Sequence, residues 1–232
     1  MIGRGAGMSK FANQRKFTVR HLIPLLNRFN YIAPVLDIGC GRGEIIRMMA
    51  CWETGEHWGI DNNVDSLCMA AKVPSNANFA LMEITVIPSI GFMANTALLC
   101  DAAEHIGIPA FDFAHKILAK NGLLYVTFPP WYSPFGGHQH LTRSWLRFIP
   151  WAHLMFPAQV QNAKPLRNPE DVQSVFRNKL TPKQVEELDG WTILYKRKYL
   201  IRPAARKGIP APNWWPDLFT MGVEYVMGRV TK

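Results

Sequence analysis

Paired cysteines and long apolar runs are both missing from this 232-residue sequence. The four cysteines, at positions 40, 51, 68 and 100, form no Cys-x-x-Cys pair, which indicates reduced thiols rather than a disulfide framework. No stretch approaches the ~20 apolar residues that a membrane span requires, and residues 1–10 lack the apolar segment of a signal peptide. We therefore expect a cytoplasmic protein, with peripheral contact at the inner membrane surface left open.

Acidic residues are absent from residues 1–30, which carry six Lys or Arg. Residues 31–140 have ten acids against five bases, whereas residues 141–232 have fifteen bases against seven acids, and the whole chain has a net charge of +9. Basic flanks around an acidic centre favour an anionic substrate or surface, such as phosphate, nucleic acid or a lipid headgroup. A solubilising basic face explains the same distribution equally well, because the bases are spread along the chain.

What the sequence does contain is a glycine-rich turn directly after a short apolar stretch. Residues 35–38 predict a buried parallel strand, glycines follow at 39, 41 and 43, and residues 45–50 have a helical pattern. Glycines in such a turn allow a ligand to approach the backbone, and the N–H groups at the helix start then face that ligand. The pattern predicts a nucleotide-like cofactor.

Two common nucleotide-binding motifs are incomplete here. The third glycine of the dinucleotide fingerprint would fall at Glu44, and no Gly-Lys-Ser/Thr follows the turn. The stretch Asp37-Ile38-Gly39-Cys40-Gly41-Arg42-Gly43 instead resembles the first motif of class I S-adenosylmethionine-dependent methyltransferases. The resemblance implies that S-adenosylmethionine is the cofactor and that this stretch, with Asp37, Gly39, Cys40, Gly41 and Gly43, binds it.

A second part of the same resemblance follows eighteen residues after the last of these glycines. The run His57-Trp58-Gly59-Ile60-Asp61 is similar to the second strand of that family, which ends in an acid. Such an acid accepts hydrogen bonds from both hydroxyls of a ribose. We therefore expect Asp61, with Asn62 beside it, in the cofactor site; an exposed Asp next to an ordinary glycine turn is the alternative.

Two further strand ends complete the expected cofactor site. Glu83 and Ile84 match by position the acid and apolar residue that the family places against the adenine, although a solvent-exposed Glu at a strand end has the same pattern. Cys100 and Asp101 end the fourth predicted strand and lead into Glu104-His105-Ile106, which resembles the family's fourth motif at the methionine end of the cofactor. Asn95 departs from the family, which commonly has an acid where that strand begins.

The order of predicted elements implies an α/β fold with a doubly wound, mostly parallel, Rossmann-like sheet and helices on both faces. The resemblance implies seven strands, the seventh antiparallel, with a substrate-covering insertion after strand five. Strands are expected at 34–38, 57–61, 78–83, 95–100, 123–128, 191–202 and 221–230, and helices at 11–29, 45–50, 64–72, 111–120 and 181–188, with 121–122 as a C-cap.

We expect one domain over residues 1–232. The insertion is predicted because residues 129–140 contain three prolines and a glycine pair, and tryptophans and bases follow; a small satellite core is the other interpretation. The expected parts are a lid helix and tail at 1–30, a cofactor-binding core at 31–130, the insertion at 131–180, and a C-terminal helix and strand pair at 181–232.

Methyl transfer from a sulfonium requires that the nucleophile, the methyl carbon and the sulfur are aligned, and that one proton from the acceptor is taken up. His138 follows strand five on a Gly-Gly loop and is the candidate general base, while His105 is expected to pack beside the methionine moiety. Tyr132 is a candidate for orienting the acceptor, or simply a loop aromatic. His138 and His140 could bind a metal, but two histidines without a nearby acid make a weak site, so no metal is predicted.

The acceptor is indicated mainly by what is absent. The Asn/Asp-Pro-Pro-Tyr/Phe motif of many methyltransferases acting on planar nitrogen does not follow strand four. This favours a small-molecule hydroxyl acceptor, such as a sugar, a lipid-linked saccharide or another metabolite, and an anionic or lipid-linked molecule would suit the basic, Trp-rich flank. RNA is the second choice, with bases contacting phosphate and aromatics stacking on nucleobases. A non-catalytic S-adenosylmethionine-binding module is the third.

Overall fold

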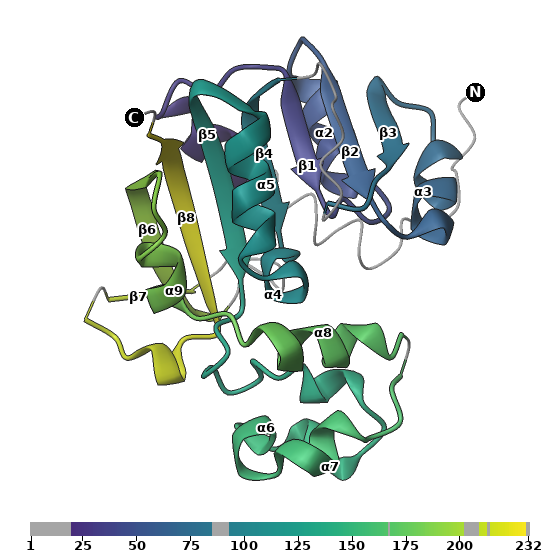
Figure 1. The fold of residues 1–232 in the computed structure, drawn as a ribbon, viewed down its shortest axis with the longest axis vertical. Helices are drawn as coiled ribbons and strands as arrows, with labels where there is room; N and C mark the ends of the chain where they lie inside the picture. The colour runs from purple at the N-terminus through teal and green to yellow at the C-terminus, as the bar shows by residue number, and fades with distance from the viewer. Residues whose placement is uncertain (1–19, 85–92, 167, 202–208, 213, 231–232) are drawn as a thin grey trace, which may run out of the picture.

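Figure 1 shows the fold in a computed structural model that describes residues 20–84, 93–166, 168–201, 209–212 and 214–230. The described residues form one sheet with the strand order β3-β2-β1-β4-β5-β8-β6-β7. Strands β1 to β5 pair in parallel with one another, and β8 runs antiparallel between β5 and β6. The strands are β1 Val35–Ile38, β2 His57–Asp61, β3 Ala77–Leu81, β4 Ala94–Cys100, β5 Leu118–Phe128, β6 Trp191–Ile201, β7 Ile209–Ala211 and β8 Gly222–Arg229.

The sheet has eight strands where the sequence predicted seven. The additional strand, β7, is three residues long, contains Pro210 and pairs only with β6 at the edge of the sheet. A proline inside a three-residue segment gives no strand signal, and an edge position is where a sheet tolerates it. The mostly parallel order and the antiparallel last strand are as expected.

Alternating strand residues bury the two faces of the sheet in separate apolar clusters. Ile38 and Leu99 pack in one cluster with residues of α5, whereas Val35 and Leu98 pack in the other with residues of α2. The period of two follows from the pleat, which turns successive side chains to opposite faces. The helices are α2 Glu44–Trp52, α3 Val64–Ala71, α4 Ala103–Ile106, α5 Pro109–Ile117, α6 Ala152–Met155, α7 Pro157–Gln161, α8 Glu170–Asn178 and α9 Pro182–Glu186, with short 3-10 turns η1 Gln139–Leu141, η2 Trp145–Phe148 and η3 Asp217–Phe219.

The predicted end of the helix at 111–120 was wrong. Helix α5 stops at Ile117, and β5 begins at Leu118. The pairing of β5 with β4 then jumps from Leu118 to Leu123, and Asn121 takes a positive φ of 64° in the residues between. The Asn-Gly pair therefore makes a turn, as its residue types indicate, but within an irregular strand rather than at a helix end.

The residues predicted as an insertion form a small helical unit at the end of the sheet toward which the parallel strands point (Figure 1). This unit has its own apolar cluster, which includes Trp131, Leu146, Val172 and Phe176. The satellite core considered from the sequence is therefore present. Within the described parts of the chain, no helix is long and apolar enough to cross a membrane.

Of the helix expected at 11–29, residues 20–29 belong to the described part of the chain, and 20–27 are helical. This segment buries Leu22, Leu25 and Leu26 against one face of the sheet. A role of the preceding residues as a cofactor lid stays a prediction.

A buried carboxylate ties this N-terminal helix to the sheet. Glu224 on β8 is fully buried, and the hydroxyls of Tyr125 and Tyr199 donate to it over 2.7 and 2.6 Å. His21 Nε2 lies 2.9 Å from the same carboxylate. Burial by itself raises the pKa of Glu224, but the hydrogen bond and charge of His21, together with the tyrosine hydroxyls, outweigh it and lower that pKa.

Replacing this carboxylate should cost stability in a pH-dependent way. We expect Glu224→Gln to lower the free energy of unfolding by about 1–3 kcal/mol near neutral pH, because a buried charged acceptor is lost. A lowered folded-state pKa stabilises the protein above the unfolded-state pKa of Glu, and this contribution is lost as the pH falls through the folded-state value. Urea unfolding of both proteins should therefore show a difference that shrinks in acid.

The matched control is Glu187→Gln, since the Glu187 side chain is 64% exposed and should have almost no effect. A difference between the Glu224→Gln variant and the natural protein that stays constant with pH would show that the charge of Glu224 does not stabilise the fold.

Candidate active site

A cavity of about 490 Å³ lies at the carboxyl ends of the parallel strands. Turns that follow β1, β2, β3 and β4 form most of its wall, and helix α8 of the insertion closes one side. This is the edge at which open α/β sheets bind their ligands. The described residues that line it are Gly39, Ile60, Asp61, Asn62, Met82, Glu83, Ile84, Asp101, Ala102, His105, Ile106, Arg177 and Asn178.

The three glycines of the first turn serve different physical needs. All have a positive φ, between 55° and 71°. A Cβ on Gly39 would lie 2.7 Å from Ala102, and a Cβ on Gly43 would lie 2.3 Å from the Phe79 ring, so both positions are closed by packing. A Cβ on Gly41 would meet no atom of the described residues within 4 Å. Gly41 is therefore the position of the turn at which a ligand could approach the backbone.

Asp61 connects the ends of β1 and β2. The backbone N–H of Gly41 donates to its Oδ2 over 2.7 Å, and the N–H of Asn63 donates to its Oδ1 over 2.8 Å. An ionised carboxylate has about four acceptor positions, so both oxygens retain capacity for further donors. Asp61 lines the cavity and at the same time fixes the glycine turn.

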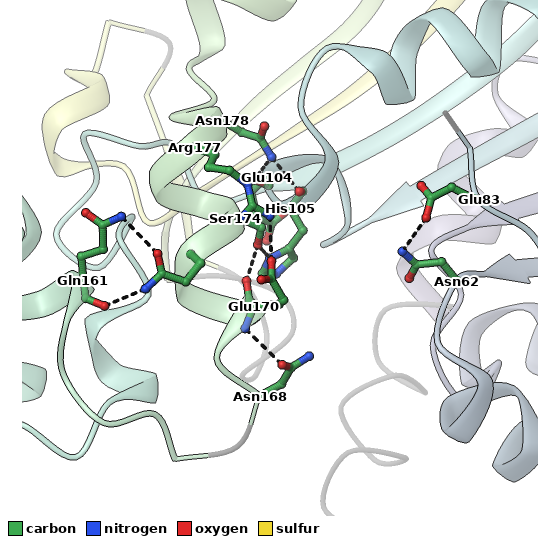
Figure 2. A network of polar contacts seen from close by, with 11 residues as sticks. Asn62, Glu83, Glu104, His105, Gln161, Asn168, Glu170, Ser174, Arg177 and Asn178 are labelled. Atoms are coloured by element: carbon green, nitrogen blue, oxygen red, sulfur yellow. Dashed lines mark hydrogen bonds and ion pairs between the residues drawn. The ribbon is translucent and has the colours of Figure 1, made fainter. Parts of the chain in front are cut away.

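Polar groups that directly follow β2 and β3 meet in the wall of the cavity. The side-chain amide of Asn62 donates to Glu83 Oε2 over 3.2 Å, as Figure 2 shows, and Ile84 lines the cavity next to them. The turn after β1 thus contributes backbone to the site, and the ends of β2 and β3 contribute side chains. An apolar residue beside a carboxylate suits a flat ring with a polar edge.

The remaining predicted cofactor residues lie around the cavity rather than all in its wall. Asp101 lines it, has a φ of 56° and accepts a hydrogen bond from the Thr127 hydroxyl over 3.2 Å. Asp37, Cys40 and Cys100 are buried, and neither they nor Gly41 and Gly43 are among the lining residues. Burial, followed by the charges of Asp37 and Asp61, raises the pKa of the Cys40 thiol, so this thiol remains protonated.

The insertion contributes residues that sequence reasoning missed. The Asn178 side chain donates to the backbone carbonyls of Glu104 and His105, over 3.3 and 2.6 Å, and so holds α4 against α8 (Figure 2). Arg177 also lines the cavity, and it pairs with Glu170 over 2.7 Å. These residues lie more than seventy positions after α4. No local pattern could have linked them to the site.

His105 is oriented by a two-step hydrogen-bond chain. The Ser174 hydroxyl donates to the backbone carbonyl of Glu170 over 2.5 Å. It can therefore accept from Nδ1 of His105, which lies 2.9 Å away, and this assigns the proton to Nδ1. In the neutral ring, Nε2 is then the basic nitrogen.

His105 and His138 stack on each other, with ring centroids 5.0 Å apart and planes 8° from parallel. His105 lines the first cavity, and His138 lines a second one of about 270 Å³ with Pro129, Ser133, Phe135, His140 and Met221. The two histidines, predicted separately from two strand ends, therefore form a shared boundary between two adjacent cavities.

Glu104 joins these histidines in a cluster. One ligand atom from each of the three side chains lies within 4.8 Å of the others. The sequence paired His138 with His140 and identified no nearby acid, whereas the fold brings Glu104 close. Imidazole lone pairs lie in the ring plane, so two rings 8° from parallel direct them side by side rather than toward one ion. The stack as it stands is not arranged as a coordination site.

Tyr132, the third predicted catalytic residue, is 50% exposed. Its backbone carbonyl accepts from the Trp151 indole over 3.2 Å. The residue sits directly before Ser133, which lines the second cavity. Its backbone therefore adjoins the second cavity, but Tyr132 itself is not among the residues that line it.

Known structures share the fold of this chain but little of its sequence. The plantazolicin methyltransferase BpumL, solved with a triazolic desmethyl analogue and S-adenosylhomocysteine, matches with a TM-score of 0.59 over 96% of this chain and 86% of that chain, at 13% identity. A methyltransferase from Clostridium acetobutylicum matches with a TM-score of 0.55 over 94% of this chain and 92% of that chain, at 11% identity. A possible histamine N-methyltransferase from Thermotoga maritima matches with a TM-score of 0.53 over 96% of this chain and 93% of that chain, at 13% identity.

The fold is that of class I S-adenosylmethionine-dependent methyltransferases. No family model matches the sequence, and no curated protein matches it. At these identities the likeness concerns the fold alone. The matches span 94–96% of this chain, so the likeness in fold is not confined to the parallel part of the sheet.

The raised pKa of Cys40 can be tested by alkylation. We expect iodoacetamide to modify the exposed Cys51 and Cys68 at least about tenfold faster than the buried Cys40 and Cys100 in the folded protein, because the thiolate is the reactive form. Peptide mass spectrometry over time measures all four rates in one sample. Labelling of Cys40 as fast as that of Cys51 would mean that the thiol is accessible and ionised.

Proposed function

We propose that this protein is an S-adenosylmethionine-dependent methyltransferase that methylates a hydroxyl of a small-molecule acceptor. The observation that carries the proposal is the turn at 39–43, which is open at Gly41 and bonded to Asp61, beside the cavity whose wall includes Gly39 and Asp61. A cavity of about 490 Å³ is within the usual range for cofactor sites. The methyltransferase fold supports the same assignment.

The cavity residues fit the parts of S-adenosylmethionine. Asp61, with Asn62, would accept the ribose hydroxyls, and Glu83 with Ile84 would take the adenine edge and face. Asp101 would bind at the methionine end, with Cys100 behind it. The backbone at Gly39, Gly41 and Gly43 would pass beneath the cofactor, with Asp37 and Cys40 supporting the turn. When bound, S-adenosylmethionine supplies an electrophilic methyl group on its sulfonium.

The acceptor would occupy the second cavity, on the other side of the histidine stack. His138 would take the proton from the acceptor hydroxyl as a general base, and His105, held through Ser174, would shape the boundary beside the methyl group. Tyr132 would contact the acceptor from the exposed side. Because the histidines lie between two cavities, a base there is adjacent to both reactants.

The acceptor classes under this proposal are a sugar, a lipid-linked saccharide or another metabolite with a hydroxyl group. RNA is the second candidate, because residues 141–232 carry a net charge of +8. A module that binds S-adenosylmethionine without catalysis is the third, and the stacked histidines between two cavities argue against it. BpumL was solved with a triazolic desmethylPZN analogue.

Cofactor binding provides the first test of the proposal. Calorimetry should show binding of S-adenosylmethionine and S-adenosylhomocysteine, and weaker or no binding of NAD. Gly41→Val should abolish binding by placing a branched side chain in the open position of the turn. Asp61→Asn should weaken binding at least about tenfold, since hydrogen bonds to a charged acceptor contribute about 1.5–3 kcal/mol each.

Asp65→Asn is the matched control, because Asp65 is an exposed acid four positions further along the chain and outside the cavity lining. Tighter binding of NAD than of S-adenosylmethionine would overturn the cofactor assignment. Equal affinity of Asp61→Asn and the natural protein would remove Asp61 from the site.

The role of His138 as a base is tested by kinetics with an acceptor found in a panel of hydroxyl compounds. His138→Ala should lower kcat by ~10²–10⁴-fold with little change in cofactor affinity, and the acid limb of the pH–rate profile should disappear. His140→Ala, in the same loop and cavity, should change KM more than kcat. Turnover of His138→Ala within a fewfold of the natural protein would indicate catalysis by alignment alone.

A further inference from the structure

The second cavity has an uncharged lining. Its described walls are Pro129, Ser133, Phe135, His138, His140 and Met221, without a Lys, Arg, Asp or Glu among them. A molecule there meets mainly apolar and aromatic surface and a few neutral polar groups. A phosphate or carboxylate placed in this cavity would lose its water without gaining an ionic partner.

Exposed aromatic side chains continue from this cavity to the surface. We call this surface the aromatic rim, which consists of Tyr132, Trp151, Trp214, Trp215, Leu218 and Phe219. Four of these residues are largely exposed: Tyr132 at 50%, Trp214 at 76%, Leu218 at 42% and Phe219 at 46%. Exposed large apolar side chains that occur together mark a binding surface more often than single ones do.

Contacts join the rim into one structure although its parts are far apart in the sequence. The Trp151 indole donates to the backbone carbonyls of Tyr132 and Leu218, over 3.2 and 3.1 Å, and its ring lies edge-on to Phe219 at 5.6 Å. Trp215 packs against Phe219 with ring centroids 6.3 Å apart, and Trp214 packs against Trp215 with ring centroids 5.8 Å apart. The rim is therefore a connected surface.

The chain segments that form the rim adjoin those that line the second cavity. Tyr132 directly precedes Ser133, and Phe219 is two positions before Met221, and both Ser133 and Met221 line the cavity. The backbone N–H of Trp151 donates to the carbonyl of Pro134 over 2.6 Å, between two lining residues. A molecule with one end in the cavity would extend across the rim.

Buried polar contacts fix the rim in its exposed position. Lys198 is only 8% exposed, and its ammonium donates to the Trp215 carbonyl over 2.7 Å and pairs with Asp217 over 2.8 Å. The Thr220 hydroxyl donates to the Pro216 carbonyl over 3.1 Å. The positive charge beneath the rim is thus neutralised, and the exposed rim side chains are themselves uncharged.

We propose that the acceptor is an uncharged amphiphile, whose hydroxyl-bearing head enters the second cavity and whose apolar tail lies across the aromatic rim. This inference rests on the proposed function, and it specifies the acceptor class. A free sugar has hydroxyls on all sides and would leave the rim uncovered. RNA would need basic side chains for its phosphates, and none of the described residues that form the rim or line the cavity is Lys or Arg.

The test uses the full chain saturated with S-adenosylhomocysteine, with calorimetry as the readout. The probes are octyl β-glucoside below its critical micelle concentration, glucose, and an oligouridylate. We expect octyl β-glucoside to bind, and glucose and the oligouridylate to bind at least about tenfold more weakly or not at all. The double variant Trp214→Ser with Phe219→Ser should weaken octyl β-glucoside binding at least about tenfold, because two large apolar contacts are lost.

The matched control is Trp52→Ser with Met69→Ser, which removes two side chains of similar exposure, 54% and 46%, from α2 and α3. This variant should bind octyl β-glucoside like the natural protein. Affinity for S-adenosylhomocysteine should be unchanged in both variants, which shows that they are folded.

Three results would overturn the proposal. They are equal affinity for glucose and octyl β-glucoside, higher affinity for the oligouridylate than for octyl β-glucoside, or an equal loss of octyl β-glucoside affinity in the rim and control variants.

The source of the amphiphile is distinguished by neutral phosphatidylcholine vesicles that contain octyl β-glucoside. Sedimentation of the protein with these vesicles would indicate acceptors presented in a bilayer, and binding only of monomeric octyl β-glucoside would indicate acceptors in solution. Absence of S-adenosylhomocysteine binding would instead contradict the proposed function itself.

Discussion

Close packing of the turn after β1 is the constraint on which the candidate site depends. Two of its glycines leave no room for a Cβ: Gly39 lies against Ala102 at the start of α4, and Gly43 lies against Phe79 on β3. These contacts pack the turn against β3 and against the segment that follows β4, and Asp61 at the end of β2 holds the backbone N–H of Gly41. The cavity, its acid and its open backbone position all follow from this packing.

The insertion is part of the same site rather than a separate cover. Asn178 on α8 satisfies two backbone carbonyls of α4, and Ser174 on the same helix orients His105. A four-residue helix such as α4 has little stability of its own, so these hydrogen bonds fix its position. A shift of the insertion would therefore move the boundary between the two cavities, on the side where methyl transfer is proposed.

The two cavities differ in chemistry because they are built from different parts of the chain. Turns of the parallel sheet provide carboxylates, an amide and open backbone to the first cavity. The proline-rich loop after β5 and the segment before β8 provide neutral and aromatic side chains to the second. The two histidine rings form the boundary, with a polar cavity on one side and a largely apolar one on the other. This division is what the proposed transfer, from a charged cofactor to an uncharged acceptor, would require.

Features formed by residues that are close in sequence could be predicted, because local sequence patterns encode them. The turn at 39–43, the acid Asp61 and the alternation of strands and helices were all readable, since each depends on neighbouring residues or on a short spacing. The eighth strand, the turn within β5, the approach of Glu104 to His138 and the aromatic rim were not readable. They depend on side chains that are distant in the sequence and meet only when the sheet and the insertion pack. The sequence by itself thus determined the fold class and the polar half of the candidate site, and the tertiary structure alone decided which side chains face the second cavity, because that requires long-range packing.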